Sequence, residues 1–202
     1  MSKLKIGVII SSTRETRFAD KPTQWIVDKA KERPELDVEV LDLRDFNLPF
    51  FNEVASNAWV PTKDPNAVAW QEKLAEFDGF IFVVAEYNRA ITGALKNAID
   101  QAYVEWNKKV GGIVAYGSLG GARAAENLRT IMIELQMAPT RSAVHIGGSE
   151  FMKVSPMGEN AEMSAIEGAI ASSAKDMLDQ VIWWGRATKS AREDEEQREA
   201  AE

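Results

Sequence analysis

The 202-residue sequence contains no cysteine and a single histidine, His145. The missing cysteines exclude disulfides, thiolate zinc sites, iron–sulfur ligation and a cysteine nucleophile. One histidine cannot build a multi-histidine metal site, and it makes a serine–histidine triad improbable. We therefore expect no bound metal, and we expect His145 near a strand end without a catalytic role.

Long apolar runs and an excess of basic residues are also missing. The longest apolar runs, at residues 6–10 and 79–85, fall far short of the ~20 residues that span a bilayer. The net charge is 24 − 31 = −7, which disfavours non-specific binding to nucleic acid or anionic membranes. The apolar stretch after residues 1–5 is too short for a signal peptide. We expect a cytoplasmic protein that binds neither nucleic acid nor membranes.

Short apolar runs alternate with helical patterns along the chain. Strands are predicted at residues 3–10, 37–43, 79–85, 110–116 and 141–146. Between them, apolar residues recur every three or four positions, most clearly from residue 163 to 184. Asp20 followed by Pro22 predicts a capped helix start. The adjacent Trp183 and Trp184 are expected to cover an edge of the core.

Near-continuous apolar strands separated by helices indicate a parallel sheet covered on both faces. The number of elements predicts an α/β, three-layer flavodoxin-like domain over residues 1–185, with a five-stranded parallel sheet in the order 2-1-3-4-5. Residues 186–202 form a charged tail, expected to be a frayed helix or disordered. Ligands of this fold bind beyond the carboxyl ends of the strands, so the loops after the first, third and fourth strands are the candidates for a site.

Loop 1, defined as residues 11–17, carries four hydroxyl residues and two arginines in an acidic chain. Free N–H groups before a helix attract an anion, and guanidinium groups add donors. The loop lacks the glycine–lysine pair of a Walker loop and the glycines of a dinucleotide fingerprint. It predicts an anion site, with a polar turn capped by a hydroxyl as the alternative. The candidate residues are Ser11, Ser12, Thr13, Arg14 and Arg17.

Loop 2, residues 86–92, and loop 3, residues 117–123, suit a flat ligand that is bound by main chain. The three glycines of loop 3 allow a ligand to approach the backbone closely. For loop 2, a turn with a left-handed Asn and a buried Tyr is the alternative. The candidates are Glu86, Tyr87 and Asn88 in loop 2, and Gly117, Ser118, Gly120 and Gly121 in loop 3. A phosphate at loop 1 and a flat ring at loops 2 and 3 predict FMN in a flavodoxin-like fold.

These motifs resemble those of the NADPH-dependent FMN reductase family, which includes flavin-containing quinone and azo reductases. The matching segments are residues 12–17, 86–100 and 117–123, and the similarity extends from about residue 3 to about residue 184. Ser11 stands where the family often has glycine, and Ala85 where a proline usually precedes Glu86. The resemblance implies that Ser12, Arg14 and Arg17 hold the FMN phosphate, with Ser11 and Thr13 as weaker candidates. It also implies that residues 86–88 flank the isoalloxazine and that its pyrimidine edge meets Ser118, Gly120 and Gly121.

The resemblance also implies an NAD(P)H-dependent FMN oxidoreductase. Hydride would pass from NADPH or NADH to FMN, and two electrons would then reduce a quinone, azo compound or flavin in a ping-pong cycle. Because the flavin carries the difficult step, we name no catalytic residue. Arg123 is a candidate contact to the nucleotide phosphate, with an exposed helix residue as the alternative. Family members form homodimers or homotetramers in which the partner subunit covers the flavin. The predicted helix over residues 95–106 and the aromatic residues Phe50, Phe51 and Trp59 would supply that cover, with packing of these aromatic residues within their own loop as the alternative.

Two other functions stay open on the sequence. A flavodoxin-like electron carrier would bind FMN without its own NADPH reaction, but flavodoxins are acidic around the flavin and this chain has arginines in loop 1. A response-regulator-like domain on the same fold would need clustered aspartates at the ends of the first and third strands. The chain has Ser11 and Glu86 there.

Overall fold

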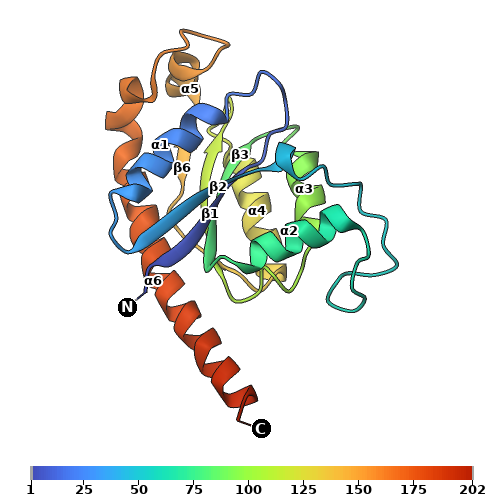
Figure 1. Ribbon diagram of the computed structural model, residues 1–202. Coiled ribbons are helices and arrows are strands. Elements are labelled where there is room, and N and C mark those ends of the chain that lie inside the picture. The colour runs from blue at the N-terminus through green and yellow to red at the C-terminus, as the bar shows by residue number, and fades with distance from the viewer. Residues whose placement is uncertain (1, 202) are drawn as a thin grey trace.

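The computed structural model describes residues 2–201 and has three layers, a central sheet with helices on both faces (Figure 1). The strands are β1 (Leu4–Ile10), β2 (Leu36–Asp42), β3 (Gly79–Ala85), β4 (Val110–Tyr116), β5 (Ala138–Pro139) and β6 (Val144–Ile146). All of them pair in parallel, in the order β2-β1-β3-β4-β5, and β6 also pairs with β4. The predicted flavodoxin-like fold and strand order are therefore confirmed.

Helices α1 to α4 connect successive strands as crossovers, and α5 and α6 follow the last strand. The α-helices are α1 (Asp20–Lys31), α2 (Pro65–Ala75), α3 (Gly93–Asp100), α4 (Ala122–Glu134), α5 (Gly148–Val154) and α6 (Glu167–Glu199), with 3₁₀ turns η1 (Leu43–Asp45) and η2 (Met163–Ile166). The Asp64 carboxylate caps α2 and the Thr92 hydroxyl caps α3 by accepting backbone N–H bonds. The predicted cap at Asp20 is wrong: Asp20 is the first residue of α1, and its carboxylate accepts from Arg17 instead.

The sheet edge beyond β4 also differs from the prediction. The sequence predicts one strand over residues 141–146, whereas β5 and β6 pair with opposite ends of β4. Between them, Thr140 Oγ1 donates to the Ser142 carbonyl at 2.8 Å, and the Ser142 N–H donates to Gln180 of α6 at 3.0 Å. The chain therefore pairs with β4 in two short segments and makes other contacts between them.

Two apolar cores lie on opposite faces of the sheet. Helices α1 and α6 cover one face, and α2, α3 and α4 cover the other. All seven residues of β3 are buried, as expected for a central strand between two layers. The stripe predicted over residues 163–184 packs into the first core through Ile170, Met177 and Val181. The carboxyl ends of the strands, with loops 1 to 3, lie at the top of Figure 1.

Two aromatic predictions are corrected by the structure. Residues 95–106 do not form one helix, because α3 ends at Asp100 and Trp106 lies fully buried in the second core. Trp183 and Trp184 do not cover the core edge, since they are 64% and 41% exposed. Their rings instead pack against each other with centroids 4.7 Å apart, while Val181 and Ile182 take the buried positions of this turn.

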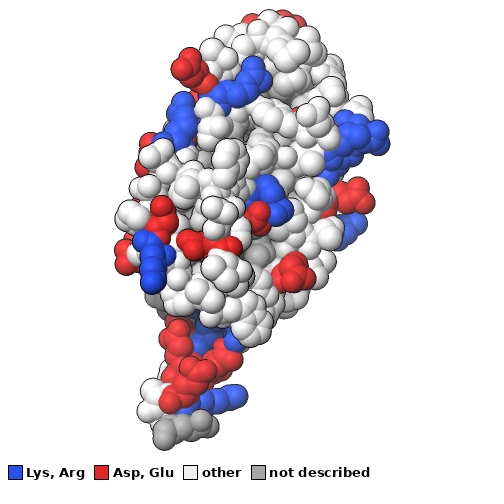
Figure 2. Space-filling model, turned by 90° about the vertical axis from the view of Figure 1, so that its right-hand side faces the viewer, with Lys and Arg blue, Asp and Glu red and all other residues white. Residues whose placement is uncertain are grey.

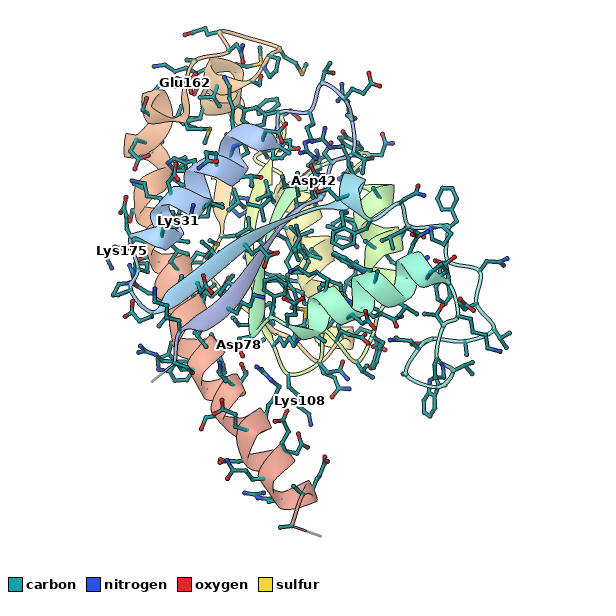
Figure 3. All side chains as sticks on the ribbon, in the orientation of Figure 1. Lys31, Asp42, Asp78, Lys108, Glu162 and Lys175 are labelled. Carbon is teal, nitrogen blue, oxygen red and sulfur yellow. The ribbon has the colours of Figure 1, made fainter. Side chains whose placement is uncertain are left out.

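Helix α6 continues past residue 185 and projects from the body of the molecule (Figure 1), so residues 186–199 are helical. Figure 2 shows acidic side chains gathered on this projection. Its base is attached at the amino ends of the strands, where Asp78, labelled in Figure 3, accepts hydrogen bonds of 2.9 Å from both Lys189 and Arg192. The division at residue 185 stays a prediction. Across residues 2–201, no helix combines the length and apolarity that a membrane crossing needs.

Candidate functional site

A cavity of about 400 Å³ opens where loops 1, 2 and 3 follow β1, β3 and β4. Seven predicted residues line it: Ser12, Arg14, Arg17, Glu86, Tyr87, Gly117 and Ser118. The remaining predicted residues of the loops lie outside its lining: Ser11, Thr13, Asn88, Gly120, Gly121 and Arg123. Thr13 lines a separate hollow on the η1 side of loop 1. The fold therefore brings three loops that are far apart in the sequence to one site.

The backbone of loop 1 has a run of unpaired donors. Within residues 2–201, no hydrogen bond joins the backbone N–H groups of residues 13–16 to another protein atom. These four residues are exposed, and Arg14 and Thr16 line the cavity. Free N–H groups beside a guanidinium suit an anion. Ser11 is different, because it is fully buried and its carbonyl accepts from Thr92 Oγ1 at 2.8 Å, so it anchors the loop.

The guanidinium of Arg17 lies inside the protein, with 1% of its side chain exposed. It donates to both carboxylate oxygens of Asp42 (2.7 and 2.6 Å), to Asp20 (2.9 and 2.5 Å) and to the Ser12 carbonyl (2.9 Å). Burial opposes its charge, but the two carboxylates raise the pKa of Arg17 above its ordinary value. Burial also opposes the charge of Asp42, but Arg17 and Arg44 hold the pKa of that carboxyl far below its usual range.

Loop 2 forms a tight turn. Tyr87 and Ala90 exchange two backbone hydrogen bonds of 3.0 Å, and Asn88 and Arg89 between them have φ of 50° and 70°. This is the geometry of a two-residue hairpin, which favours Asn, and Asn88 has the left-handed conformation of the alternative prediction. Tyr87 is not buried: it is 36% exposed, and its hydroxyl lies 3.4 Å from Ser12 Oγ of loop 1.

An ion pair joins loop 2 to loop 3. The Glu86 carboxylate accepts from the backbone N–H of Arg123 (3.0 Å), from its Nε (2.6 Å) and from its Nη2. Burial opposes the charge of Glu86, but Arg123 lowers the pKa of this carboxyl below its ordinary value. The pair sits at the first turn of α4, where a carboxylate also suits the helix dipole. In the described chain, Nη1 of Arg123 makes no hydrogen bond and is available to a further acceptor.

Loop 3 depends on glycine. Gly121 has φ of +65°, and a Cβ there would lie 2.7 Å from both the Ala115 Cβ and the Tyr116 nitrogen, which no other residue type tolerates. The carbonyl of Gly120 contacts Nδ1 of His145 at 2.9 Å. His145 lies in β6, so the single histidine of the chain contacts the backbone of loop 3.

A fourth wall of the cavity is not predicted by the sequence. It consists of Phe151, Ser155, Pro156 and Met157. Ser155 Oγ is buried without a hydrogen-bond partner, and an unsatisfied hydroxyl in a cavity wall suits a polar group of a ligand or a water molecule. The ammonium group of Lys21 holds this wall against α1 by donating to oxygens of residues 154, 160 and 161. No periodic pattern marks residues 155–161.

Aromatic rings form part of the lining. Phe18 meets Tyr116 edge-on with ring centroids 5.0 Å apart, and Tyr116 lies nearly parallel to Phe151 at 6.3 Å. Burial raises the pKa of Tyr116, so its hydroxyl stays protonated in neutral solution. The cavity thus combines apolar aromatic walls with the donors of loop 1, an arrangement that suits a ligand with a flat part and an anionic part.

Known proteins share this sequence pattern. The family model described as NADPH-dependent FMN reductase matches residues 4–150. An NAD(P)H-dependent FMN reductase of Nectria sp is 36% identical over 186 residues, which are 86% of this chain and 92% of the relative. An NADPH:quinone oxidoreductase of Arabidopsis thaliana is 30% identical over 140 residues, covering 66% of this chain and 69% of the relative.

Solved structures share the fold. FerB, a flavoenzyme NAD(P)H:(acceptor) oxidoreductase from Paracoccus denitrificans, superposes with a TM-score of 0.67 at 18% identity, over 92% of this chain and 98% of that one. This likeness agrees with the strand order, and the family-model match over residues 4–150 includes all three cavity loops. The chain belongs to the NADPH-dependent FMN reductase family and is an oxidoreductase.

Proposed function

We propose that the cavity binds FMN and that the chain is an NAD(P)H-dependent reductase of quinones, azo compounds or free flavins. The observation that carries this proposal is the meeting of unpaired loop 1 N–H groups, the exposed Arg14 and aromatic walls in one cavity. FMN needs the same combination, because a phosphate dianion and a planar ring sit at its two ends. The orphan hydroxyl of Ser155 supplies a further polar group for its phosphate or ribityl chain.

The residues divide into ligands and supports. Ser12, Arg14 and the N–H groups of residues 13–16 would hold the phosphate, and guanidinium is well matched to it. The backbone of Glu86 and Tyr87 and the loop 3 residues Gly117 and Ser118 would meet the ring. Outside the lining, Ser11, Asn88, Gly120 and Gly121 would set the backbone path of their loops.

Bound FMN supplies hydride acceptance from NAD(P)H and two-electron donation to an acceptor. The chain's own task is to hold the ring with one face open and to keep water from the other. We assign it no acid–base residue. The three loops enclose a single cavity, so we propose that nucleotide and acceptor use it in turn, which gives ping-pong kinetics. Free Nη1 of Arg123 is our candidate for the nucleotide phosphate.

The irregular connection after η1 exposes apolar side chains. Phe50 is 88%, Val54 96% and Trp59 83% exposed, and clustered exposed apolar residues mark interaction sites. We propose that this connection packs against a second copy of the chain in a homodimer or homotetramer. The expected location is the cytoplasm, where NAD(P)H is available, and cell fractionation tests it.

The proposed function is tested with purified protein. Protein reconstituted with FMN should absorb near ~450 nm, as flavins do, and should bleach when NADPH is added without oxygen. Oxidation of NADPH should then depend on a quinone, azo or flavin acceptor. Failure to oxidise NADPH with any of these acceptors would contradict the enzyme assignment. If the protein binds FMN but stopped-flow measurements show no direct reduction of that FMN by NADPH, the alternative function as a flavodoxin-like electron carrier is favoured.

A further inference from the structure

Arg17 lines the cavity, yet it has no donor to offer a ligand. A guanidinium carries five N–H groups. In the structure, Nε donates to Asp20, Nη1 donates to Asp42 and to the Ser12 carbonyl, and Nη2 donates to Asp20 and Asp42. These five bonds account for all five N–H groups. Direct binding of a phosphate by Arg17 would require one of the bonds to break.

The partners of Arg17 belong to three different segments. Asp42 ends β2, and Figure 3 places it at the upper end of the sheet. Asp20 begins α1, and Ser12 lies in loop 1, directly before the run of unpaired N–H groups. The Asp42 side chain is only 15% exposed, so removing Arg17 would leave a poorly hydrated carboxylate with Arg44 as its remaining partner. The five bonds therefore hold loop 1 in a fixed position relative to β2 and α1.

The bond to the Ser12 carbonyl also orients the next peptide group. A trans peptide unit is planar, and its C=O and N–H point in opposite directions. Because the Ser12 carbonyl points toward the buried Arg17, the Thr13 N–H must point away from it, toward the exposed side of the loop. Loop 1 can then offer this N–H to a phosphate without first being ordered, which lowers the cost of binding.

We propose that Arg17 and Asp42 form a positioning pair that shapes loop 1 for a phosphate dianion, while Arg14 is the guanidinium that touches the phosphate. This inference rests on the proposed binding of FMN. Arg44 shares the Asp42 carboxylate but is 41% exposed and does not bond to loop 1. It therefore serves as the matched control.

The experiment compares dissociation constants of FMN and riboflavin by flavin fluorescence, in the full chain and in R17M, R17K, D42N, R17M/D42N and R44M. R17M and D42N should each weaken FMN binding about tenfold or more and weaken riboflavin binding much less. The double variant should bind FMN no more weakly than the weaker single variant, because one unit is broken in each case. R17K should recover part of the lost FMN affinity, and R44M should change the dissociation constant of FMN by less than about threefold.

Other outcomes overturn the proposal. If Arg17 bound the phosphate directly, D42N would free its guanidinium and leave FMN affinity unchanged or tighter, while R17M alone weakened it. Additive losses in the double variant would likewise contradict a pair. If R17M does not fold, D42N and R17K carry the same comparison. If the native protein binds no FMN, the proposed function is refuted. If the native protein binds FMN and D42N binds it equally well, only the positioning pair is refuted.

Discussion

The ammonium group of Lys109 donates a hydrogen bond of 2.9 Å to the carbonyl of Leu74 in the last turn of α2. Lys109 is 6% exposed. Burial, reinforced by the nearby charge of Arg192, lowers the pKa of Lys109 to about 8. A lysine in an unfolded chain has a pKa of about 10.4. The unfolded chain therefore binds more protons than the folded chain between these two values, so stability should rise with pH across that window.

Replacing Lys109 with methionine removes this dependence. The free energy of unfolding of K109M, minus that of the native protein, should be larger at pH 7 than at higher pH. This difference should fall by about 3 kcal/mol between pH 7 and pH 10.5. Urea unfolding at several pH values measures it. K31M, at an exposed lysine, is the control and should show little change with pH. A stability difference between K109M and native protein that does not vary with pH would contradict the buried-lysine account.

Replacing Arg14 with alanine should weaken the binding of FMN by about 1.5–3 kcal/mol more than the binding of riboflavin, since a charged hydrogen bond to phosphate is lost. Fluorescence titration of both flavins measures the difference. R141A removes an exposed arginine outside the cavity and should affect neither ligand. Equal losses for FMN and riboflavin would show that Arg14 does not touch the phosphate.

Arg123 should influence the choice between nucleotides. If its free Nη1 meets the 2′-phosphate, R123A should raise the KM for NADPH about tenfold relative to that for NADH. E86Q breaks the same ion pair but keeps the guanidinium, so it should preserve the preference. Steady-state kinetics with both nucleotides separate the two variants. If E86Q and R123A change the ratio of the two KM values alike, Arg123 acts only through its ion pair with loop 2.

Ending the chain after Gly185 tests the boundary between the domain and its tail. The shortened protein should fold and bind FMN within about twofold of the full chain. It should lose about 1–3 kcal/mol of stability, because Asp78 gives up Lys189 and Arg192. D78N should then cost less in the shortened protein than in the full one. If D78N lowers stability equally in the full and the shortened protein, the contacts of Asp78 with the tail do not contribute to stability.

Trp59 should contribute to self-association. We expect the native protein to sediment as a dimer or tetramer, and W59S combined with F50S should shift it toward monomer, because exposed aromatic rings are common interface anchors. W184S removes another exposed tryptophan, on α6, and should leave the assembly intact. Dissociation caused by W184S, but not by the double variant, would place the interface on α6.

The central part of the fold is predictable because its signals are local. Residues 79–85 and 110–116 coincide with β3 and β4, since an uninterrupted apolar run bounded by polar residues marks a buried strand. The break between β5 and β6 depends on Gln180, a residue 38 positions beyond Ser142. Such a distant partner leaves no local signal.

The candidate site follows the same rule. Loops 1 to 3 were identifiable because parallel strands deliver their carboxyl ends to one edge of the sheet. The hydrogen bonds of Arg17 are not predictable from loop 1, because its main partner, Asp42, is 25 residues away on β2. The fourth wall is not predictable for a related reason. Ser155 reaches the cavity only because α5 packs near α1, and its own segment has no repeating pattern.

The crossed indole rings of Trp183 and Trp184 sit on the surface of α6, whereas Trp70 and Trp106 are fully buried. Light emitted by the surface pair should be quenched by iodide dissolved in the buffer, and the buried pair should be shielded from it. In a variant without the exposed Trp59, the surface pair would therefore report contact with solvent, and the buried tryptophans would report the integrity of the core.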